Sequence, residues 1–355
     1  MKVNAPLLTS LIALWTMTPS SVAQDNTVPP PLSLDMTNVT VSGLSSGGYM
    51  ATQFHLAHSD WVTGVGVLAA GPYYCAQGDI TQALAKCVDK LASPIDIVAL
   101  NKHAKTYEEQ GKIAPLENLH AAKVWLYHGT KDTRVIRKVS DRLYEQYQAW
   151  VDENNIKYVN DKPTAHLFPT QKNGGDCQTS KAPYIGKCNY DAAGAMLSHL
   201  VGDLNSPDDQ LSGALYTIDQ HASSGHASTL AKEAFVYVPE NCASGEPCRA
   251  HISFHGCNQY ADAVGNAYVT QTGINTWADD NNIVVLYPQT KKSLFMPLNP
   301  QGCWDWWGYT SSDYANRDGE QIKAVTQMLK SLNHEGGSAR HFEAEGAQMK
   351  ETPNE

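Results

Sequence analysis

The sequence lacks an excess of positive charge. Its 355 residues include 26 Lys and Arg against 36 Asp and Glu, which gives a formal net charge of −10 at pH 7. Nucleic-acid backbones and anionic membranes attract basic surfaces, so we expect neither as a partner. The chain also lacks an apolar run long enough to cross a bilayer, and we therefore expect no membrane span.

The first residues nevertheless indicate export. Lys2 precedes a mostly apolar stretch over residues 5–17, which Pro19 and the small-residue triplet Ser21-Val22-Ala23 follow. This is the layout of a secretory signal peptide. We predict a signal peptide over residues 1–23, cleaved after Ala23, and a secreted protein that is extracellular or periplasmic.

Cysteine spacings typical of metal sites are missing. The eight cysteines form no C-x-x-C pair, and no Cys and His spacing matches zinc, so we expect no metal. An even number of cysteines in an exported protein predicts disulfides instead, in one of many possible pairings. Proximity in the sequence favours Cys75–Cys87, Cys177–Cys188 and Cys242–Cys248, and it leaves Cys257 to pair with Cys303.

No internal repeat or clear linker divides the rest of the chain. We expect a polar N-terminal segment over residues 24–36, a single domain over 37–332 and a disordered tail over 333–355. Within the domain, strand-like and helix-like segments alternate, which predicts an α/β fold with a mostly parallel sheet and helices on both faces. A core of this size can bury most of its apolar surface without a second subunit, so we expect a monomer.

A candidate nucleophile follows the first predicted strand, residues 38–41. Gly43-Leu44-Ser45-Ser46-Gly47 fits the pattern G-x-S-x-G, and a predicted helix over residues 49–58 comes directly after it. In a strained strand-to-helix turn, this pattern exposes the serine hydroxyl while small neighbours avoid clashes. The alternative is a simple turn of small residues. We interpret Ser45 as a nucleophile because of its position between strand and helix.

A serine nucleophile needs a histidine base and a carboxylate that orients it. Asp132 follows a predicted strand over residues 123–127, and His166 follows the next one, so the order is serine, acid, histidine as in α/β-hydrolases. Asp132 could instead cap the following helix. His128 is a competing histidine, but it precedes the acid and so breaks this order.

The oxyanion hole requires two backbone N–H groups. Ser46, directly after the nucleophile, supplies one candidate. The other usually comes from a His-Gly loop upstream of the serine, yet no such loop precedes Ser45, and the candidate is His255-Gly256-Cys257, far downstream. If the end of the domain were joined to its beginning, this loop would precede the serine. The sequence therefore predicts a circularly permuted α/β-hydrolase fold with Cys257 as the second donor.

A dense aromatic segment, Gly302–Tyr309, contains Trp304, Trp306 and Trp307. Cys303 would hold it near the oxyanion loop. Aromatic rings offer flat apolar area for an acyl chain or a polymer, so we predict these tryptophans as substrate-binding residues. The alternative is core packing beneath a loop.

Residues 38–332 resemble the circularly permuted, single-domain, secreted polyhydroxybutyrate depolymerases. The matching stretches include VSGLSSGGYMATQ, GTKDT, HLFPT, HGCNQ and GCWDWWGY. This resemblance implies a triad of Ser45, Asp132 and His166, oxyanion donors at Ser46 and Cys257, and Trp306 packed against a hydroxybutyrate unit. It also implies hydrolysis of the ester bonds of poly(3-hydroxybutyrate) without a cofactor.

Two other functions fit the same residues. An esterase acting on soluble short-chain esters or plant cell-wall acyl groups would use the same catalytic side chains. A non-catalytic polymer-binding protein would use only the aromatic segment, although the serine, acid and histidine argue against it.

Overall fold

The computed structural model describes residue 1 and residues 28–208 and 210–333. Residues 2–23 of the predicted signal peptide lie outside the described residues, as do residues 334–355 of the predicted tail. In the part of the chain that is described, no helix is both long and apolar enough to cross a membrane.

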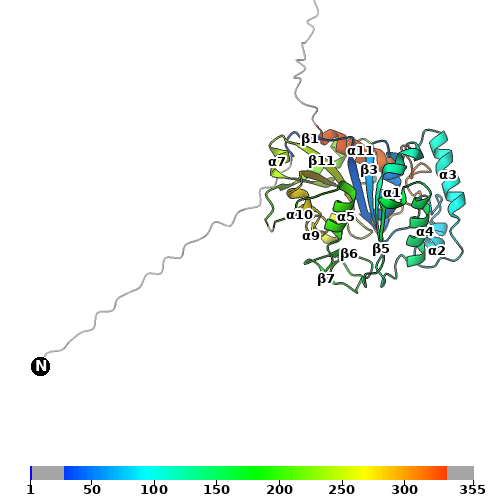
Figure 1. Cartoon of the computed structure of the whole chain (residues 1–355), viewed down its shortest axis with the longest axis horizontal. Helices are drawn as coiled ribbons and strands as arrows, with labels where there is room; N and C mark the ends of the chain where they lie inside the picture. Colours follow the sequence, from blue (N-terminus) through cyan, green and yellow to red (C-terminus); the bar gives the residue numbers. More distant parts are fainter. Residues whose placement is uncertain (2–27, 209, 334–355) are drawn as a thin grey trace, which may run out of the picture.

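A nine-stranded sheet forms the centre of the molecule (Figure 1). Its strands are β1 (Ser33–Leu34), β2 (Val39–Leu44), β3 (Val62–Leu68), β4 (Lys123–Tyr127), β5 (Ile156–Val159), β9 (Ala214–Asp219), β10 (Glu233–Val238), β11 (Pro247–Phe254) and β12 (Ile283–Tyr287). They lie in the order β5-β4-β3-β2-β11-β12-β10-β9, with β1 paired to β11. Only β9 and β10 run antiparallel to their neighbours, so the prediction of a mostly parallel sheet is confirmed.

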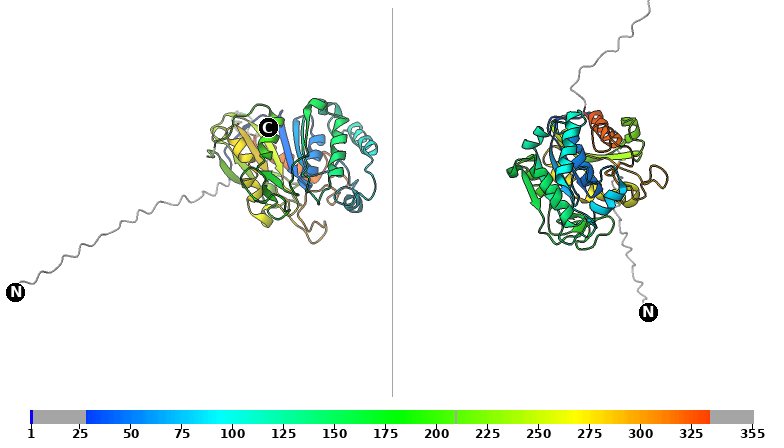
Figure 2. Two further views of the ribbon diagram at one scale, coloured as in Figure 1. Left: turned by 60° about the horizontal axis from the view of Figure 1, so that its bottom comes forward. Right: turned by 90° about the vertical axis from the view of Figure 1, so that its right-hand side faces the viewer.

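Helices cover both faces of this sheet (Figure 2). The longer helices are α1 (Ser46–Ala57), α2 (Ile80–Lys86), α3 (Ile97–Glu109), α4 (Arg137–Gln148), α5 (Ala192–Val201), α10 (Ile274–Asp279) and α11 (Glu320–Leu332). The shorter ones are α6 (Gln220–Ser223), α7 (Glu240–Ala243), α8 (Ala261–Val264), α9 (Ala267–Gln271) and two 3₁₀ turns, Leu116–Ala121 and Glu153–Asn155.

Successive residues of a strand point to opposite faces, so each central strand contributes to two cores. In β4, Val124 and Leu126 join a core that includes α1, α4 and α11, whereas Trp125 and Tyr127 join a core that includes α5 and α10. Strands buried on both faces need almost continuous apolar sequence. The all-apolar β12 has that composition, and all of its residues are buried.

The two ends of the described domain lie side by side. Leu32 pairs with Asn333, and the Leu34 N–H donates to the Asn333 side-chain oxygen at 2.9 Å. Reading the strands from β9 through β12 and then from β2 to β5 gives the strand order of an α/β-hydrolase sheet. The prediction of a permuted α/β-hydrolase fold is therefore confirmed, because the new ends meet where the usual chain would be continuous.

The ordered domain begins before residue 37. Leu32 and Leu34 are buried, and β1 pairs with the start of β11. The segment over residues 24–36 thus contributes a strand to the domain. A strand of two residues within a polar, Pro-rich stretch leaves no pattern that a sequence could reveal.

All eight cysteines are paired in the order that sequence proximity favoured. The disulfides join Cys75 to Cys87, Cys177 to Cys188, Cys242 to Cys248 and Cys257 to Cys303. Cys75, Cys87, Cys242 and Cys248 are buried in the core, and Cys248 lies in β11. Each disulfide also restricts the unfolded chain, which stabilises the fold.

Candidate active site

Ser45 occupies the sharp turn between β2 and α1. Its backbone lies at φ 58° and ψ −120°, a conformation that is costly for a residue with a side chain. A Cβ atom at Gly43 would lie 2.1 Å from the Gly47 carbonyl oxygen, and one at Gly47 would lie 2.1 Å from the Phe254 carbonyl oxygen. Only glycine fits at both positions, so the turn packs directly on β11 and the start of α1 points at the site.

Asp132 and His166 form a hydrogen-bonded pair. The His166 Nδ1 and the Asp132 Oδ2 lie 2.7 Å apart, and the aspartate side chain is completely buried. The other carboxylate oxygen accepts the N–H groups of Arg134 at 2.8 Å and Val135 at 3.0 Å. When Nδ1 donates to this carboxylate, Nε2 of a neutral imidazole is left as the acceptor, which is the state a general base requires.

A small second sheet holds His166 in place. It consists of β6 (Phe168–Thr170), β8 (Ile185–Lys187) and β7 (Gly175–Asp176). The Ser180 hydroxyl donates to the His166 carbonyl at 3.0 Å, and the Ala165 N–H donates to the Cys177 carbonyl at 2.9 Å. The Cys177–Cys188 disulfide closes this unit, whose strands were too short to predict from the sequence.

His128, the competing histidine, does not line the cavity described below. It is buried behind the acid, and its Nε2 lies 2.9 Å from the Val135 carbonyl oxygen. Because Val135 also donates its N–H to Asp132, His128 contacts the same loop that holds the acid.

A cavity of about 480 Å³ opens above the serine. Ser45, Ser46, His166, Cys257, Trp306 and Trp307 all line it, together with apolar side chains from α2 and polar side chains from the loops after β11 and β12. The predicted nucleophile, base, oxyanion donors and two of the three tryptophans therefore surround one space. Asp132 lies behind His166, as the orienting acid should.

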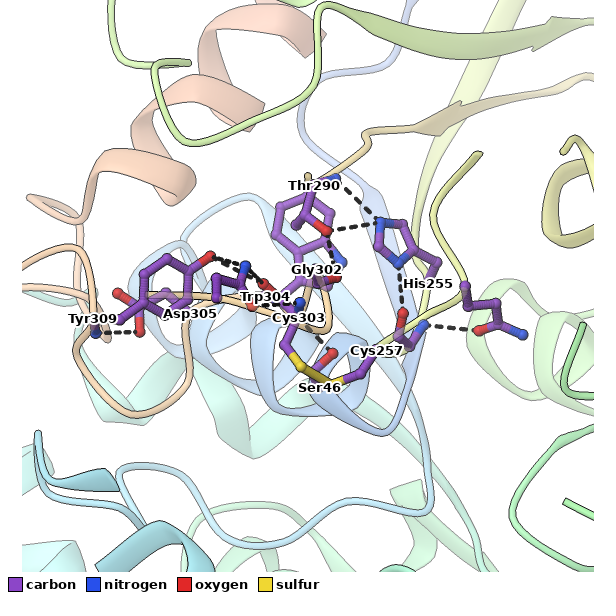
Figure 3. Close-up of a disulfide and its surroundings, with 12 residues drawn as sticks. Ser46, His255, Cys257, Thr290, Gly302, Cys303, Trp304, Asp305 and Tyr309 are labelled. Atoms are coloured by element: carbon purple, nitrogen blue, oxygen red, sulfur yellow. Dashed lines mark hydrogen bonds between the residues drawn. A yellow bond between two sulfur atoms is a disulfide. The ribbon is translucent and has the colours of Figure 1, made fainter. Parts of the chain in front are cut away.

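The His-Gly loop after β11 is fixed from both sides (Figure 3). His255 accepts the Thr290 N–H at its Nε2 (3.1 Å), so its Nδ1 carries the proton and donates to the Gly256 carbonyl at 2.7 Å. Burial lowers the pKa of His255 to about 4, which keeps this neutral form at neutral pH. The Gln259 side chain also accepts the Gly256 N–H at 2.8 Å.

This arrangement aims the Cys257 N–H. In a trans peptide the C=O and N–H groups point in opposite directions. Because the Gly256 carbonyl faces His255, the Cys257 N–H faces away from it, and neither this amide nor that of Ser46 donates to another residue that the structure describes. The disulfide to Cys303 holds the loop against the aromatic segment, as Figure 3 shows.

Trp306 and Trp307 form one wall of the cavity. Trp306 stacks on Tyr49 of α1 with ring centroids 4.4 Å apart, and Trp307 packs against it edge-on. Asp305 holds this segment from within, since its buried carboxylate accepts the N–H groups of Gly308 at 2.7 Å and Thr310 at 2.8 Å, among others. Burial raises the pKa of Asp305, although these hydrogen bonds oppose the rise.

The prediction that Trp304 binds substrate is wrong. Its side chain is fully buried and packs edge-on against Phe254 of β11, and it does not line the cavity. Trp306, two residues further along this irregular segment, does line the cavity. Sequence density alone could not distinguish the two orientations.

No group of three or more His, Cys, Asp or Glu side chains that could hold a metal ion occurs within the described ranges. Ser45, His166 and Asp132, with the amides of Ser46 and Cys257, are the residue types that acyl transfer uses.

Several known proteins are similar to this chain. The model of the prolyl oligopeptidase family matches residues 31–189. A poly(3-hydroxybutyrate) depolymerase from Delftia acidovorans is 41% identical over 312 residues, which cover 86% of this chain and 61% of the relative. A polyhydroxybutyrate depolymerase from Talaromyces funiculosus is 36% identical over 317 residues, covering 85% of this chain and 91% of the relative. The chain belongs to the polyhydroxybutyrate depolymerase family.

Solved structures of this family share the fold. A PHB depolymerase in complex with an R3HB trimer is 34% identical with a TM-score of 0.81, and the match covers 87% of this chain and 100% of that one. The PHB depolymerase from Penicillium funiculosum is 35% identical, with the same TM-score and coverage. This chain spans about 61% of the length of the Delftia relative, so the two differ in overall extent.

Proposed function

We propose that the protein is a serine esterase that hydrolyses the ester bonds of poly(3-hydroxybutyrate) or its oligomers through an acyl-enzyme on Ser45. The single observation that carries the proposal is the 2.7 Å bond between Asp132 and His166 behind a cavity that Ser45 and His166 both line. The names of the two curated relatives and the R3HB trimer bound to a structural neighbour support the substrate class.

The proposed reaction proceeds in two half-reactions. His166 Nε2 takes the Ser45 hydroxyl proton while Oγ bonds to the ester carbonyl carbon, and the oxyanion accepts the N–H groups of Ser46 and Cys257. The carbon–oxygen bond to the leaving group breaks, and the proton passes from His166 to the departing alkoxide oxygen. Water then attacks the acyl-enzyme by the same route and releases a carboxylic acid and free Ser45.

An exposed apolar loop favours a solid polymer over a soluble ester. Ser293 and Asn299 pair through two backbone hydrogen bonds, 2.7 Å and 2.9 Å long, and Asn299 lines the cavity. Between them, Leu294, Phe295 and Met296 are 66%, 84% and 87% exposed. Apolar side chains presented this fully to water mark an interaction surface. A soluble short-chain ester would gain nothing from them, because they lie outside the cavity.

Soluble-ester and plant cell-wall esterases would share the catalytic residues, and a polymer-binding protein would need none of them. Clearing of a poly(3-hydroxybutyrate) suspension by the purified mature protein tests the proposal, with Ser45→Ala as the control. We expect clearing by the wild type alone. Cleavage of p-nitrophenyl butyrate without clearing would favour a soluble esterase, and adsorption without either reaction would favour a binding protein.

We also infer that the mature protein is a monomeric, secreted enzyme whose catalytic domain corresponds to residues 37–332 with the added strand β1. Four disulfides among the described residues favour an oxidising compartment. N-terminal sequencing of protein exported from an expression host tests the cleavage after Ala23. Retention of the uncleaved chain in the cytoplasm would contradict it.

A further inference from the structure

The cavity contains one permanently charged side chain. Among the residues that line it, Arg134 is the only Lys, Arg, Asp or Glu. The other lining side chains are apolar, aromatic or neutral polar groups, apart from the imidazole of His166. The chain as a whole carries a formal net charge of −10. A positive charge at the substrate cavity of an acidic protein therefore runs against the overall charge and provides a local attraction for anions.

The backbone of Arg134 is fixed relative to the catalytic residues. Its N–H donates to the Asp132 Oδ1 at 2.8 Å, two residues from the acid that orients His166. The backbone of Arg134 is therefore held by the same carboxylate that orients His166. A group bound by the guanidinium would be held at a defined place relative to Ser45.

The guanidinium of Arg134 is free to bind a ligand. Its side chain is exposed and makes no ion pair or hydrogen bond with any residue that the structure describes. By contrast, Arg137, Arg142 and Arg317 each pair with a carboxylate on the surface. Arg134 thus lacks the structural role that these three arginines have.

The reaction proposed above creates a matching anion. Each hydrolysis of a polyester bond leaves one product with a carboxylate end, and every soluble oligomer carries a single such end. A guanidinium binds a carboxylate through two parallel hydrogen bonds, a geometry that an ammonium cannot reproduce. We propose that Arg134 binds the terminal carboxylate of hydroxyacyl oligomers, so that the enzyme selects acid-ended chains. This inference rests on the proposed function.

Terminal binding of this kind has a kinetic consequence. An oligomer held by its carboxylate presents its ester bonds at fixed distances from that end. Short chains would therefore be cleaved at a set position relative to the carboxylate end rather than at random positions. The released hydroxyacid carries the same group and would compete for Arg134. Both effects weaken at high ionic strength, because the arginine is exposed to solvent.

The test compares two hydroxybutyrate trimers, one with a free carboxylate and one with a methyl ester in its place. The measured quantity is the ratio of kcat/KM for the acid trimer to that for the ester trimer. In Arg134→Gln we expect this ratio to fall about tenfold, since a charge-assisted bidentate contact is lost. Lys131→Gln is the matched control: it removes another exposed positive charge from the same loop, but Lys131 does not line the cavity.

Three results would overturn the proposal: an unchanged ratio in Arg134→Gln, an equal loss for both trimers, or the same fall in Lys131→Gln. If the wild type hydrolyses neither trimer, the proposed function fails. The role of Arg134 is then tested by measuring how strongly 3-hydroxybutyrate inhibits the cleavage of p-nitrophenyl butyrate. Carboxylate binding is supported if 3-hydroxybutyrate inhibits Arg134→Gln about tenfold more weakly than the wild type, while the uncharged 3-hydroxybutyramide inhibits both proteins equally weakly. Equal inhibition of both proteins by the acid, or none of either, refutes it.

Discussion

The two sides of the cavity are built differently. On the catalytic side, Asp132, His166 and the loop at His255 are buried and held by hydrogen bonds of 2.7–3.1 Å. On the outer side, Ile80 and Leu84 of α2 line the cavity while remaining 45% and 51% exposed. Leu294, Phe295 and Met296 are more exposed still. Chemistry needs fixed geometry, whereas contact with a solid surface needs apolar area that meets water when no substrate is present.

This contrast separates the residues needed for any ester hydrolysis from those that would select the substrate. The catalytic side could serve any ester, because the acyl group and the oxyanion look alike in all of them. We propose that the exposed side carries the preference for substrate. Variants on the two sides should therefore differ in kind, and the following predictions run from the largest expected effect to the smallest.

Asp132→Asn should produce the largest loss. The amide presents a donor where His166 Nδ1 needs an acceptor, so the imidazole takes the wrong tautomer, and kcat should fall about 10⁴-fold. The loss should be the same for p-nitrophenyl butyrate and for polymer, as steady-state kinetics on both would measure. Thermal unfolding near that of the wild type would show that the fold is intact. A loss confined to polymer would contradict the assignment of the acid.

His255→Gln should have a smaller effect on turnover. It removes the donor that orients the Gly256 carbonyl, so the Cys257 N–H loses its aim, and kcat should fall about 10- to 100-fold with little change in KM. The matched control is His251→Gln. His251 is another buried histidine, but it lies on β11 and contacts Thr40 and Ser42 instead. That variant should lose stability without a comparable loss of kcat. Equal losses of kcat would assign both histidines a purely structural role.

A triple substitution of Leu294, Phe295 and Met296 by Ser should act on polymer alone. The exposed apolar area disappears while the cavity stays intact, so erosion of a polymer film should slow by about tenfold. Hydrolysis of p-nitrophenyl butyrate should stay within about twofold of the wild type, because a small ester binds inside the cavity. Equal losses on both substrates would place this loop in the catalytic side.

The last prediction, with the smallest effect at neutral pH, concerns how the free energy of unfolding depends on pH through the buried histidines. Burial lowers the pKa of His251 and His55 to about 3 and that of His255 to about 4, from 6.5 when unfolded. At pH values between the folded and the unfolded pKa, the unfolded histidines bind protons that the folded ones do not. Stability should therefore be complete above pH 6.5 and fall as the pH drops, by up to about 1.4 kcal/mol per pH unit for each histidine. Denaturant unfolding from pH 7 to pH 4 measures this, and His251→Gln should flatten the slope.

Strong local signals in the sequence predicted most of the fold. β4 matches the predicted strand over residues 123–127 residue for residue, because an apolar run between turn residues suits a buried strand. β1 and the strands of the small sheet were missed. They are two or three residues long, so their pairing depends on partners distant in the sequence rather than on their own composition.

The candidate site divides in the same way. Ser45, Asp132 and His166 could be proposed from the sequence because each follows a strand in an order that the fold requires. Trp304 was misassigned and Arg134 was overlooked, because neither position has a local signal. Whether a loop side chain faces the core or the cavity depends on how the loop packs.

The sequence by itself determined the longer strands and helices, the permuted order, the pairing of cysteines close in sequence and the residue types available for catalysis. These follow from local patterns and chain order. The tertiary structure alone decided which tryptophans reach the cavity, how His255 turns the Cys257 amide, and that Arg134 is the single charged side chain there. Such features arise where segments far apart in the chain meet, and their free energies depend on burial and geometry that no short stretch of sequence contains.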